Sequence, residues 1–468
     1  MITRIKINGF KSFQNFEIFF TPFTVVAGTN ASGKSNLFDA LMLLSRLAEK
    51  DLKTAFSEQR GDPSELFTQY DDLNYAQEMS FDVDMLVNRT VKDNWGGEAE
   101  LNNTRLRYKL TIARQSNALG VEDLIVKNES LEKIKGADDK FLKRLPKEAA
   151  VYWKTLKAGG SAKPFIETTD QNGIITISTR QDGKRGGKAR PAKAITQTVL
   201  GGINETDFPH AFAVKEEMRN WKFLQLNPEE LREPTKKDIG IKDEITQGGK
   251  NLAVALYRIK TTDPYSLKEI SRKLNNFLPN YTEVNVDDDD ANKQFIIKIK
   301  GENGKEFSSR VLSEGTLRLL ALCILEHDDR HTGLLCFEEP ENGIHPFRME
   351  AMVHLLKELS IDFGQGEGPL RQVIINTHSP VLVSKLLKWG HDDNVSIWLS
   401  RVSTFISNDN GTKRKLQISR MSPVLKKAKQ LSLFQENIDE NELKLTLSEV
   451  REYLETADTE SAINEIKT

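Results

Sequence analysis

Cysteine is almost absent from this sequence of 468 residues, which contains only Cys323 and Cys336. Both stand in apolar stretches, which predicts buried free thiols in a reducing compartment and no disulfide framework. Long apolar runs are absent too, since "LRLLALCIL" (317–325) is too short to span a bilayer and contains Arg318. The opening stretch "MITRIKINGFKSFQNFEIFF" alternates like two strands and lacks the pattern of a signal peptide. The sequence therefore predicts a cytoplasmic protein with no membrane partner.

An excess of charge of one sign is also lacking. The 66 basic and 68 acidic residues give a formal net charge of -2, so the chain has no global field for nucleic acid. A contact with DNA would need a local patch, and the candidate is the loop "DGKRGGKARPAK" (182–193). The simpler interpretation is a solvated flexible loop, and no aromatic residues are interleaved for base stacking. The basic residues of this loop are Lys184, Arg185, Lys188, Arg190 and Lys193.

A phosphate-binding loop is the clearest motif that is present. Residues 23–44, "FTVVAGTNASGKSNLFDALMLL", read as an apolar strand, a loop of small residues and a helix. From Gly28 to Ser35 the loop fits G-x-x-x-x-G-K-[ST], in which backbone N–H groups and a helix N-terminus converge on phosphate oxygens. Lys34 would reach the β- and γ-phosphates of ATP, and Ser35 would ligate Mg²⁺. The candidate nucleotide contacts of the loop are Asn30, Gly33, Lys34, Ser35 and Asn36.

Two adjacent carboxylates end a second apolar strand. In "LLCFEEPENGIHP" (334–346) the apolar residues run directly into Glu338 and Glu339. Like charges repel each other and are costly to desolvate, so a positive partner is expected at this place. Beside the phosphate-binding loop, Glu338 would hold Mg²⁺ and Glu339 would be the general base for the attacking water. The simpler interpretation is a solvated strand end, which the proline and "ENGIHP" disfavour.

Two further stretches place polar residues at the ends of apolar elements. In "RVLSEGTLRLLALCIL" (310–325), Ser313 and Gly315 stand at the start of an apolar helix, which predicts a second anion site. In "RQVIINTHSPVLVSKLL" (371–387), a third apolar strand ends at Thr377 and His378. A lone histidine is more often structural than catalytic, but the end of a third parallel strand makes His378 a catalytic candidate beside the γ-phosphate.

Taken in order, these motifs resemble those of an ABC-type ATPase, and more narrowly those of the RecF/SMC/OLD-like branch. The opening "IKINGFKSFQNFEI" looks like the "NFKSF" strand of that branch, and "EEPENGIHP" and "INTHSP" look like its acidic and histidine motifs. The resemblance is closest over 1–50 and 305–385. The sequence departs from the family at LSEGT, where LSGGQ is usual, and at Glu338, where many ABC proteins have aspartate.

The resemblance implies an α/β fold of the P-loop NTPase class. We therefore expect an ABC-type head with a mostly parallel core sheet, an antiparallel β subdomain and a helical lid. The cofactors implied are ATP and Mg²⁺, and the activity implied is ATP hydrolysis, whose turnover can be slow. A homo-oligomer, at least a dimer, is also implied, because in this family the signature of one subunit caps the nucleotide on another. Ser313 and Gly315 would then act in trans.

The family's Q-loop glutamine is assigned to Gln225 in "WKFLQLNPEELREP" (221–234). Gln59 and Gln69 are weaker alternatives, and an ordinary strand glutamine is the simpler interpretation. Fewer than ninety residues separate Gln225 from Ser313, and they contain no sustained heptads. A compact helical lid is therefore expected, without a long coiled-coil arm.

The motifs divide the chain into five expected parts. These are an N-terminal ATPase lobe with the antiparallel β subdomain (1–135), an insertion (136–215), the Q-loop candidate with the helical lid (216–304), a C-terminal ATPase lobe (305–425) and a helical tail (426–468). After His378 no cluster of acids or histidines predicts a nuclease module. A nuclease or toxin activity is therefore expected on a separate chain.

Two functional hypotheses follow. ATPases of this kind resemble the ATPase components of bacterial anti-phage systems, including the Septu and PARIS types, in which the ATPase assembles and holds a nuclease or toxin partner. The first hypothesis is an ATP-dependent oligomer that regulates or scaffolds such an effector in antiviral defence. The alternative is a RecF-like ATPase that acts on DNA in repair or recombination.

Overall fold

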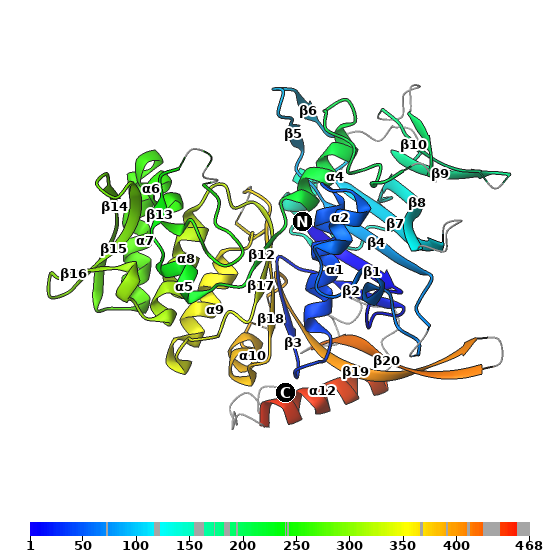
Figure 1. Ribbon diagram of the computed structural model, residues 1–468. Coiled ribbons are helices and arrows are strands. Elements are labelled where there is room, and N and C mark those ends of the chain that lie inside the picture. Colours follow the sequence, from blue (N-terminus) through cyan, green and yellow to red (C-terminus); the bar gives the residue numbers. More distant parts are fainter. Residues whose placement is uncertain are drawn as a thin grey trace.

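The computed structural model in Figure 1 contains two large sheets and a smaller one, with helices packed around them. It describes the chain except for residues 72–73, 117–121, 154–162, 173, 182–187, 193–194, 239, 241–242, 366–367, 390–391, 410–411, 425–439 and 456–468. The predicted mixed α/β fold is confirmed. Among the described residues no helix is both long enough and apolar enough to cross a membrane. Cys323 and Cys336 are buried free thiols, as predicted.

The six-stranded sheet carries the candidate site. Its order is β12-β17-β18-β3-β19-β20, with all neighbours parallel except the antiparallel pair β19 and β20. The apolar runs of the three central strands are buried, as expected for parallel strands covered on both faces. The strands are β3 (Phe23–Ala27), β12 (Lys222–Leu224), β17 (Gly333–Glu338), β18 (Arg371–Thr377), β19 (Val395–Asp409) and β20 (Thr412–Pro423).

Helices cover both faces of this sheet. Because side chains alternate along a strand, Leu334 and Cys336 face a core with α1 and the eight-stranded sheet, whereas Leu335 and Phe337 face a core with α8 to α10. The helices are α1 (Lys34–Leu47), α2 (Leu52–Ser57), α3 (Lys147–Trp153), α4 (Pro209–Arg219), α5 (Pro228–Arg232), α8 (Glu314–His327), α9 (Met349–Glu358), α10 (Pro380–Leu387) and α12 (Glu440–Glu455). Short 3₁₀ helices are η1 (Pro63–Leu66), η2 (Leu142–Arg144), η4 (Ser309–Val311) and η5 (Pro346–Arg348).

The eight-stranded sheet is antiparallel, in the order β11-β10-β9-β8-β7-β4-β1-β2. Residues 136–215, in which the sequence shows only weak periodicity, contribute the last three strands at one edge of this sheet. The strands are β1 (Ile2–Asn8), β2 (Phe16–Phe19), β4 (Glu78–Leu86), β7 (Arg105–Ser116), β8 (Glu122–Lys133), β9 (Ile166–Gln171), β10 (Ile174–Thr179) and β11 (Ala189–Pro191). A separate hairpin joins β5 (Thr90–Lys92) to β6 (Glu98–Glu100).

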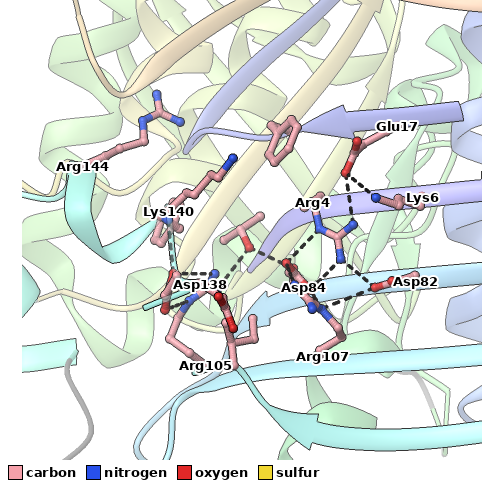
Figure 2. A pocket seen from close by; sticks show the side chains of 15 residues that line it. Arg4, Lys6, Glu17, Asp82, Asp84, Arg105, Arg107, Asp138, Lys140 and Arg144 are labelled. Atoms are coloured by element: carbon pink, nitrogen blue, oxygen red, sulfur yellow. Dashed lines mark hydrogen bonds and ion pairs between the residues drawn. The ribbon is translucent and has the colours of Figure 1, made fainter. Parts of the chain in front are cut away.

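Paired charges tie the strands of this sheet together around a cavity of about 250 Å³ (Figure 2). Asp84 accepts hydrogen bonds from Arg4 Nε at 2.8 Å and from Arg107 Nε at 2.6 Å. Arg105 Nε donates to Asp139 at 2.9 Å. Burial alone would raise the pKa of Asp84, but Arg107 and Arg4 outweigh it and lower that pKa to about 2. These five residues are called the arginine–aspartate cluster below.

The remaining elements lie in the chain between β12 and α8. Their strands form a sheet with the order β13-β15-β14, with β16 on β15. One strand of this sheet runs through an acidic stretch, where Val284 and Val286 are buried and Asp287 and Asp288 are exposed. The elements are α6 (Leu252–Thr262), α7 (Pro264–Phe277), β13 (Thr235–Lys236), β14 (Tyr281–Asp289), β15 (Gln294–Gly301) and β16 (Glu306–Ser308).

Candidate nucleotide-binding site

The loop between β3 and α1 has the backbone geometry of a phosphate cradle. Gly28, Ala31 and Gly33 have φ angles of 150°, 61° and 94°, and α1 begins at Lys34. A Cβ at Gly33 would lie 1.9 Å from Ser419 Oγ, so this position cannot hold a side chain without movement. Lys34 is 7% exposed, and its Nζ donates to the carbonyl oxygens of Gly28 at 2.8 Å and Thr29 at 2.7 Å. Burial lowers the pKa of Lys34, while Glu339 and Glu341 oppose the shift.

The "KSF" residues 11–13, in the turn between β1 and β2, contact the phosphate-binding loop's neighbours on α1 and β20. Ser12 Oγ lies 2.7 Å from Ser419 Oγ on β20 and accepts a 2.7 Å hydrogen bond from Asn36 Nδ2 on α1. Lys11 Nζ donates to Asp39, also on α1, at 2.8 Å. The motif therefore connects the N-terminal sheet, the first turns of α1 and the β19–β20 hairpin.

Glu339 follows β17 in a constrained conformation, with φ of 44°. Its backbone N–H donates to both the carbonyl oxygen of Asn376 at 3.1 Å and the Asn376 side chain at 3.0 Å. Its carboxylate lies 2.8 Å from His378 Nδ1 and accepts a 3.0 Å hydrogen bond from Asn342. The carboxylate is thus oriented by two side chains, and the backbone beneath it is fixed by the end of β18.

Glu338, the last residue of β17, has a cation nearby that the sequence did not predict. Arg60 Nη2 lies 3.4 Å from Glu338 Oε1 and 2.9 Å from Asp39 Oδ1. Burial raises the pKa of Glu338, and the neighbouring carboxylates of Asp39 and Glu339 act in the same direction, while Arg60 opposes them. A carboxylate in this setting favours a bound cation.

The loop and the acidic strand line one cavity of about 370 Å³, called the P-loop cavity here. It contains Asn30, Gly33, Lys34, Ser35 and Asn36 on one side, Glu338, Glu339 and Asn376 on another, and residues of β19 and β20 on a third. Mg²⁺ takes hard oxygen ligands and keeps several waters, so the Ser35 hydroxyl and the Glu338 carboxylate are a donor set that fits it. Among the described residues no group of three or more His, Cys, Asp or Glu side chains forms a metal cluster.

Glu341 anchors the segment that follows. It is 6% exposed, and its Oε1 accepts a 2.5 Å hydrogen bond from Thr377 Oγ1 at the end of β18. Burial raises the pKa of Glu341. The third acid of "EEPENGIHP" therefore fixes the loop to the strand that ends at His378.

The signature residues lie outside the P-loop cavity of their own chain. Ser313 is the N-cap of α8, with its Oγ 2.8 Å from Thr316 Oγ1 and accepting from Thr316 N at 3.3 Å. A Cβ at Gly315 would lie 2.8 Å from the carbonyl oxygen of Gly343, so glycine allows α8 to pack closely on the "ENGIHP" loop. Ser313 is exposed, and neither residue lines the cavity that contains Lys34.

The Q-loop candidate lies near the acidic pair. Gln225 follows β12 and lines a hollow of about 510 Å³ together with Glu338, Glu339 and Arg318. Of the alternatives, Gln59 is buried at 7% exposure, and Gln69 forms a β-bridge with Tyr75. Neither lines this hollow or the P-loop cavity, so the geometry favours Gln225.

A family model described as "AAA domain, putative AbiEii toxin, Type IV TA system" matches residues 23–384, which is more than half of the chain and includes every element described above from β3 to His378. The chain belongs to this AAA-domain family. The family match and the site together identify an ATP-binding P-loop domain. No curated protein is matched by this chain.

Several solved structures of SMC heads resemble this AAA-domain chain. One is an SMC head bound to the C-winged helix domain of ScpA, with 15% identity over 89% of this chain and 98% of that one and a TM-score of 0.46. A head domain from Thermotoga maritima has 13% identity, coverages of 90% and 98% and a TM-score of 0.36. A Pyrococcus furiosus head with an extended coiled coil, bound to the C-terminal domain of ScpA, has 13% identity, coverages of 96% and 99% and a TM-score of 0.41. Likenesses of this size say nothing about function.

Sequence reasoning missed several polar residues around the cavity of this AAA domain. Asn376 stands in "INTHSP", two positions before His378. An amide near the end of an apolar strand could have indicated a polar contact at the site. Arg60 and the serines Ser400 and Ser419 carry no local signal, because their roles depend on contacts with residues far away in the sequence.

Proposed function

We propose that this AAA domain hydrolyses ATP, with Glu339 as the base that takes the proton from the attacking water. The observation that carries the proposal is the setting of Glu339. Its carboxylate lies 2.8 Å from His378, its backbone is held twice by Asn376, and it lines the cavity that contains Lys34. A carboxylate oriented in this way can accept a proton without reorganising.

The other residues of the cavity have complementary roles. Lys34 exchanges its two backbone carbonyl contacts for the β- and γ-phosphates, which are stronger acceptors. Ser35 and Glu338 would hold Mg²⁺, and Arg60 would then release Glu338 Oε1, a change that its 3.4 Å contact and 61% exposed side chain permit. Bound Mg²⁺ neutralises charge on the phosphate oxygens. His378 lines neither the P-loop cavity nor the hollow beside Gln225, and it would act through its 2.8 Å contact with the Glu339 carboxylate, which it orients.

We further propose that ATP joins two copies of the chain. Ser313 is exposed at the start of α8 and does not reach the P-loop cavity of its own chain. Two highly exposed apolar side chains, Val311 at 69% and Phe347 at 92%, flank the contact between Gly315 and Gly343 in sequence. An exposed N-cap, with exposed apolar side chains within a few residues of it and of Gly343 in the sequence, suits a surface that another copy covers. Ser313 and Gly315 would then complete the site of the partner copy.

The cellular role we propose is an oligomeric ATPase that regulates a separately encoded nuclease or toxin in anti-phage defence. The family description, which names a putative toxin of a type IV TA system, supports a role in a toxin system of this kind, and the separate effector is part of the proposal. The alternative is a RecF-like ATPase acting on DNA. Its support is the exposed Lys188 and Arg190 at the edge strand β11, while Lys184, Arg185 and Lys193 of the same loop lie outside the described residues.

The shared site is tested by mixing two defective variants. Ser313→Arg keeps its own P-loop cavity intact but blocks the facing site, and Lys34→Ala loses nucleotide binding. Each should be inactive alone, yet a mixture should regain part of the phosphate release, because one of the two interfaces in the mixed dimer is undamaged. Ser57→Arg, at the exposed last residue of α2, is the control for an added surface arginine and should behave like the wild type.

Light scattering with ATP should show dimers for the wild type and monomers for Ser313→Arg, while both bind ATP with similar affinity. Exchange of subunits is first verified with two differently tagged chains. Background activity at every mixing ratio, despite exchange, would reject the shared site. Loss of ATP affinity in Ser313→Arg would show instead that Ser313 acts within its own chain.

A further inference from the structure

The third wall of the P-loop cavity is the β19–β20 hairpin, which no motif of the sequence pointed to. Val402 on β19 and Gln417, Ile418 and Ser419 on β20 line the cavity. The two strands are antiparallel, with Val402 opposite Ser419 and Thr404 opposite Gln417. In Figure 1 this hairpin leaves the six-stranded sheet and passes below α1 and β2.

One face of the hairpin is fixed to the phosphate-binding loop. Ser400 Oγ donates to the carbonyl oxygen of Ser32 at 2.8 Å, and Ser419 Oγ fits against Gly33 and pairs with Ser12 Oγ at 2.7 Å. Because strand residues alternate between faces, Val402 and Gln417 point to the same side as these serines, one step further from the central sheet. The loop contacts therefore place Val402 and Gln417 beside the phosphate cradle.

Both of these outer side chains are exposed, whereas Ser400 and Ser419 on the same face are buried against the phosphate-binding loop. Val402 has 48% of its surface exposed, and Gln417 is exposed between the buried Leu416 and Ile418. An exposed apolar side chain next to an exposed amide offers a flat base one contact surface and one hydrogen-bonding group. Among the described residues the Gln417 side chain has no hydrogen-bond partner that a base would have to displace.

The chemistry of the wall favours adenine. A triphosphate with Mg²⁺ would be held by Lys34, Ser35 and Glu338, which leaves the hairpin wall for the nucleoside. A glutamine amide offers a donor and an acceptor, which match the acceptor and donor on one edge of adenine, whereas the two acceptors of guanine are matched by arginine or lysine. Lys34 is the one cation among the described residues that line this cavity, and it serves the phosphates.

We propose that the hairpin face carrying Val402 and Gln417 is the base-binding wall of the site, with Val402 packing on the base and Gln417 selecting adenine. This assignment rests on the proposed binding of a nucleoside triphosphate in the P-loop cavity. It assigns substrate selection to residues outside the match with the AAA-domain family, which ends at residue 384.

The test is a set of calorimetric titrations with ATP, GTP and inorganic tripolyphosphate, each with Mg²⁺. Wild-type protein should prefer ATP to GTP. Gln417→Ala should weaken the binding of ATP about tenfold, which is the loss expected for one to two neutral hydrogen bonds. The variant should also bind ATP and GTP with more similar affinities than the wild type does. Val402→Ala should weaken the binding of ATP and of GTP by about fivefold each, because apolar contact with the base is lost. Neither variant should change the affinity for tripolyphosphate, which has no base.

Two controls separate failure of this assignment from failure of the proposed function. Ser403→Ala alters the opposite face of β19 and should match the wild type for all three ligands, and Lys34→Ala should weaken all three. If wild type binds neither ATP nor tripolyphosphate, the nucleotide site itself is rejected together with its base wall. If ATP binding depends on Lys34 but not on Gln417, or if Gln417→Ala weakens tripolyphosphate equally, the base wall alone is rejected. Equal wild-type affinity for ATP and GTP would overturn the selection of adenine.

Discussion

The P-loop cavity and the arginine–aspartate cluster are both polar hollows, but their charges are balanced differently. In the cluster (Figure 2), Asp84 is held by two guanidinium groups, and Arg105 is paired with Asp139. In the P-loop cavity, Lys34 rests on backbone carbonyls, and Glu338 has a cation only at 3.4 Å. In the first hollow the charged side chains of the cluster form close ion pairs. In the second, Lys34 and Glu338 lack, among the described residues, a close ionic partner that a bound anion or metal ion could supply.

This difference separates a structural role from a functional one. Buried opposite charges in direct hydrogen-bonded contact have little left to offer a ligand, and removal of one of them leaves the others uncompensated. Groups that are desolvated without an ionic partner gain free energy when an anion or a metal ion binds. The comparison therefore assigns stability to the arginine–aspartate cluster and ligand binding to the P-loop cavity.

The largest effect expected from this comparison is on stability. Asp84→Ala should lower the free energy of unfolding by about 3 kcal/mol, because Arg4 and Arg107 would lose their shared buried partner and keep only the more exposed Asp82 and Glu17. Lys34→Ala is the matched control, because it removes a buried cation that has no carboxylate contact. Its unfolding free energy should stay within about 1 kcal/mol of the wild type, the scale of its lost neutral-acceptor hydrogen bonds. Urea denaturation measures both.

The comparison would fail if the two variants lost similar amounts of stability. It would also fail if folded Asp84→Ala protein bound ATP more weakly than the wild type, since the arginine–aspartate cluster would then contribute to the ligand site.

A smaller effect is expected from pH. Because the pKa of Asp84 is lowered to about 2 in the folded protein, its stabilising contribution is fully present above the pKa of the unfolded chain, near 4, and is lost as the pH falls toward 2. The loss attributable to this one group is roughly 2 kcal/mol. Asp84→Asn has no such proton to bind, so the difference in unfolding free energy between wild type and variant should shrink by that amount. Urea titrations at fixed ionic strength between pH 5 and pH 2.5 follow it, and a difference independent of pH would contradict the assignment.

The parts of the site that were predicted from the sequence are contiguous motifs. Glu338 and Glu339 end one apolar strand, and His378 follows another. Lys34 and Ser35 begin the helix after the loop that follows β3, and parallel strands bring their carboxyl ends to one edge. The phosphate-binding loop and the acidic strand could therefore be placed together without knowledge of the remaining chain. Gln225 follows the same rule, because β12 pairs in parallel with β17.

The parts that could not be predicted depend on contacts between distant segments. Arg60 contacts Glu338, which is 278 residues away in the sequence. Ser400, from the C-terminal part of the chain, donates to Ser32 in the phosphate-binding loop. The strands β9 to β11 carry weak apolar periodicity because they form one edge of the antiparallel sheet, where polar side chains are tolerated. Such contacts have no signature in local spacing.

The most direct test of the account is single-turnover phosphate release from saturating ATP with Mg²⁺. Glu339→Gln keeps the shape and the contact with Asn342 but cannot accept the proton, so it should bind ATP like the wild type and release phosphate at least about 100-fold more slowly. Glu341→Gln is the control, because that buried carboxyl faces Thr377, and the variant should retain most of the rate. The central claim would be contradicted if Glu339→Gln released phosphate at the wild-type rate while its ATP binding still depended on Lys34.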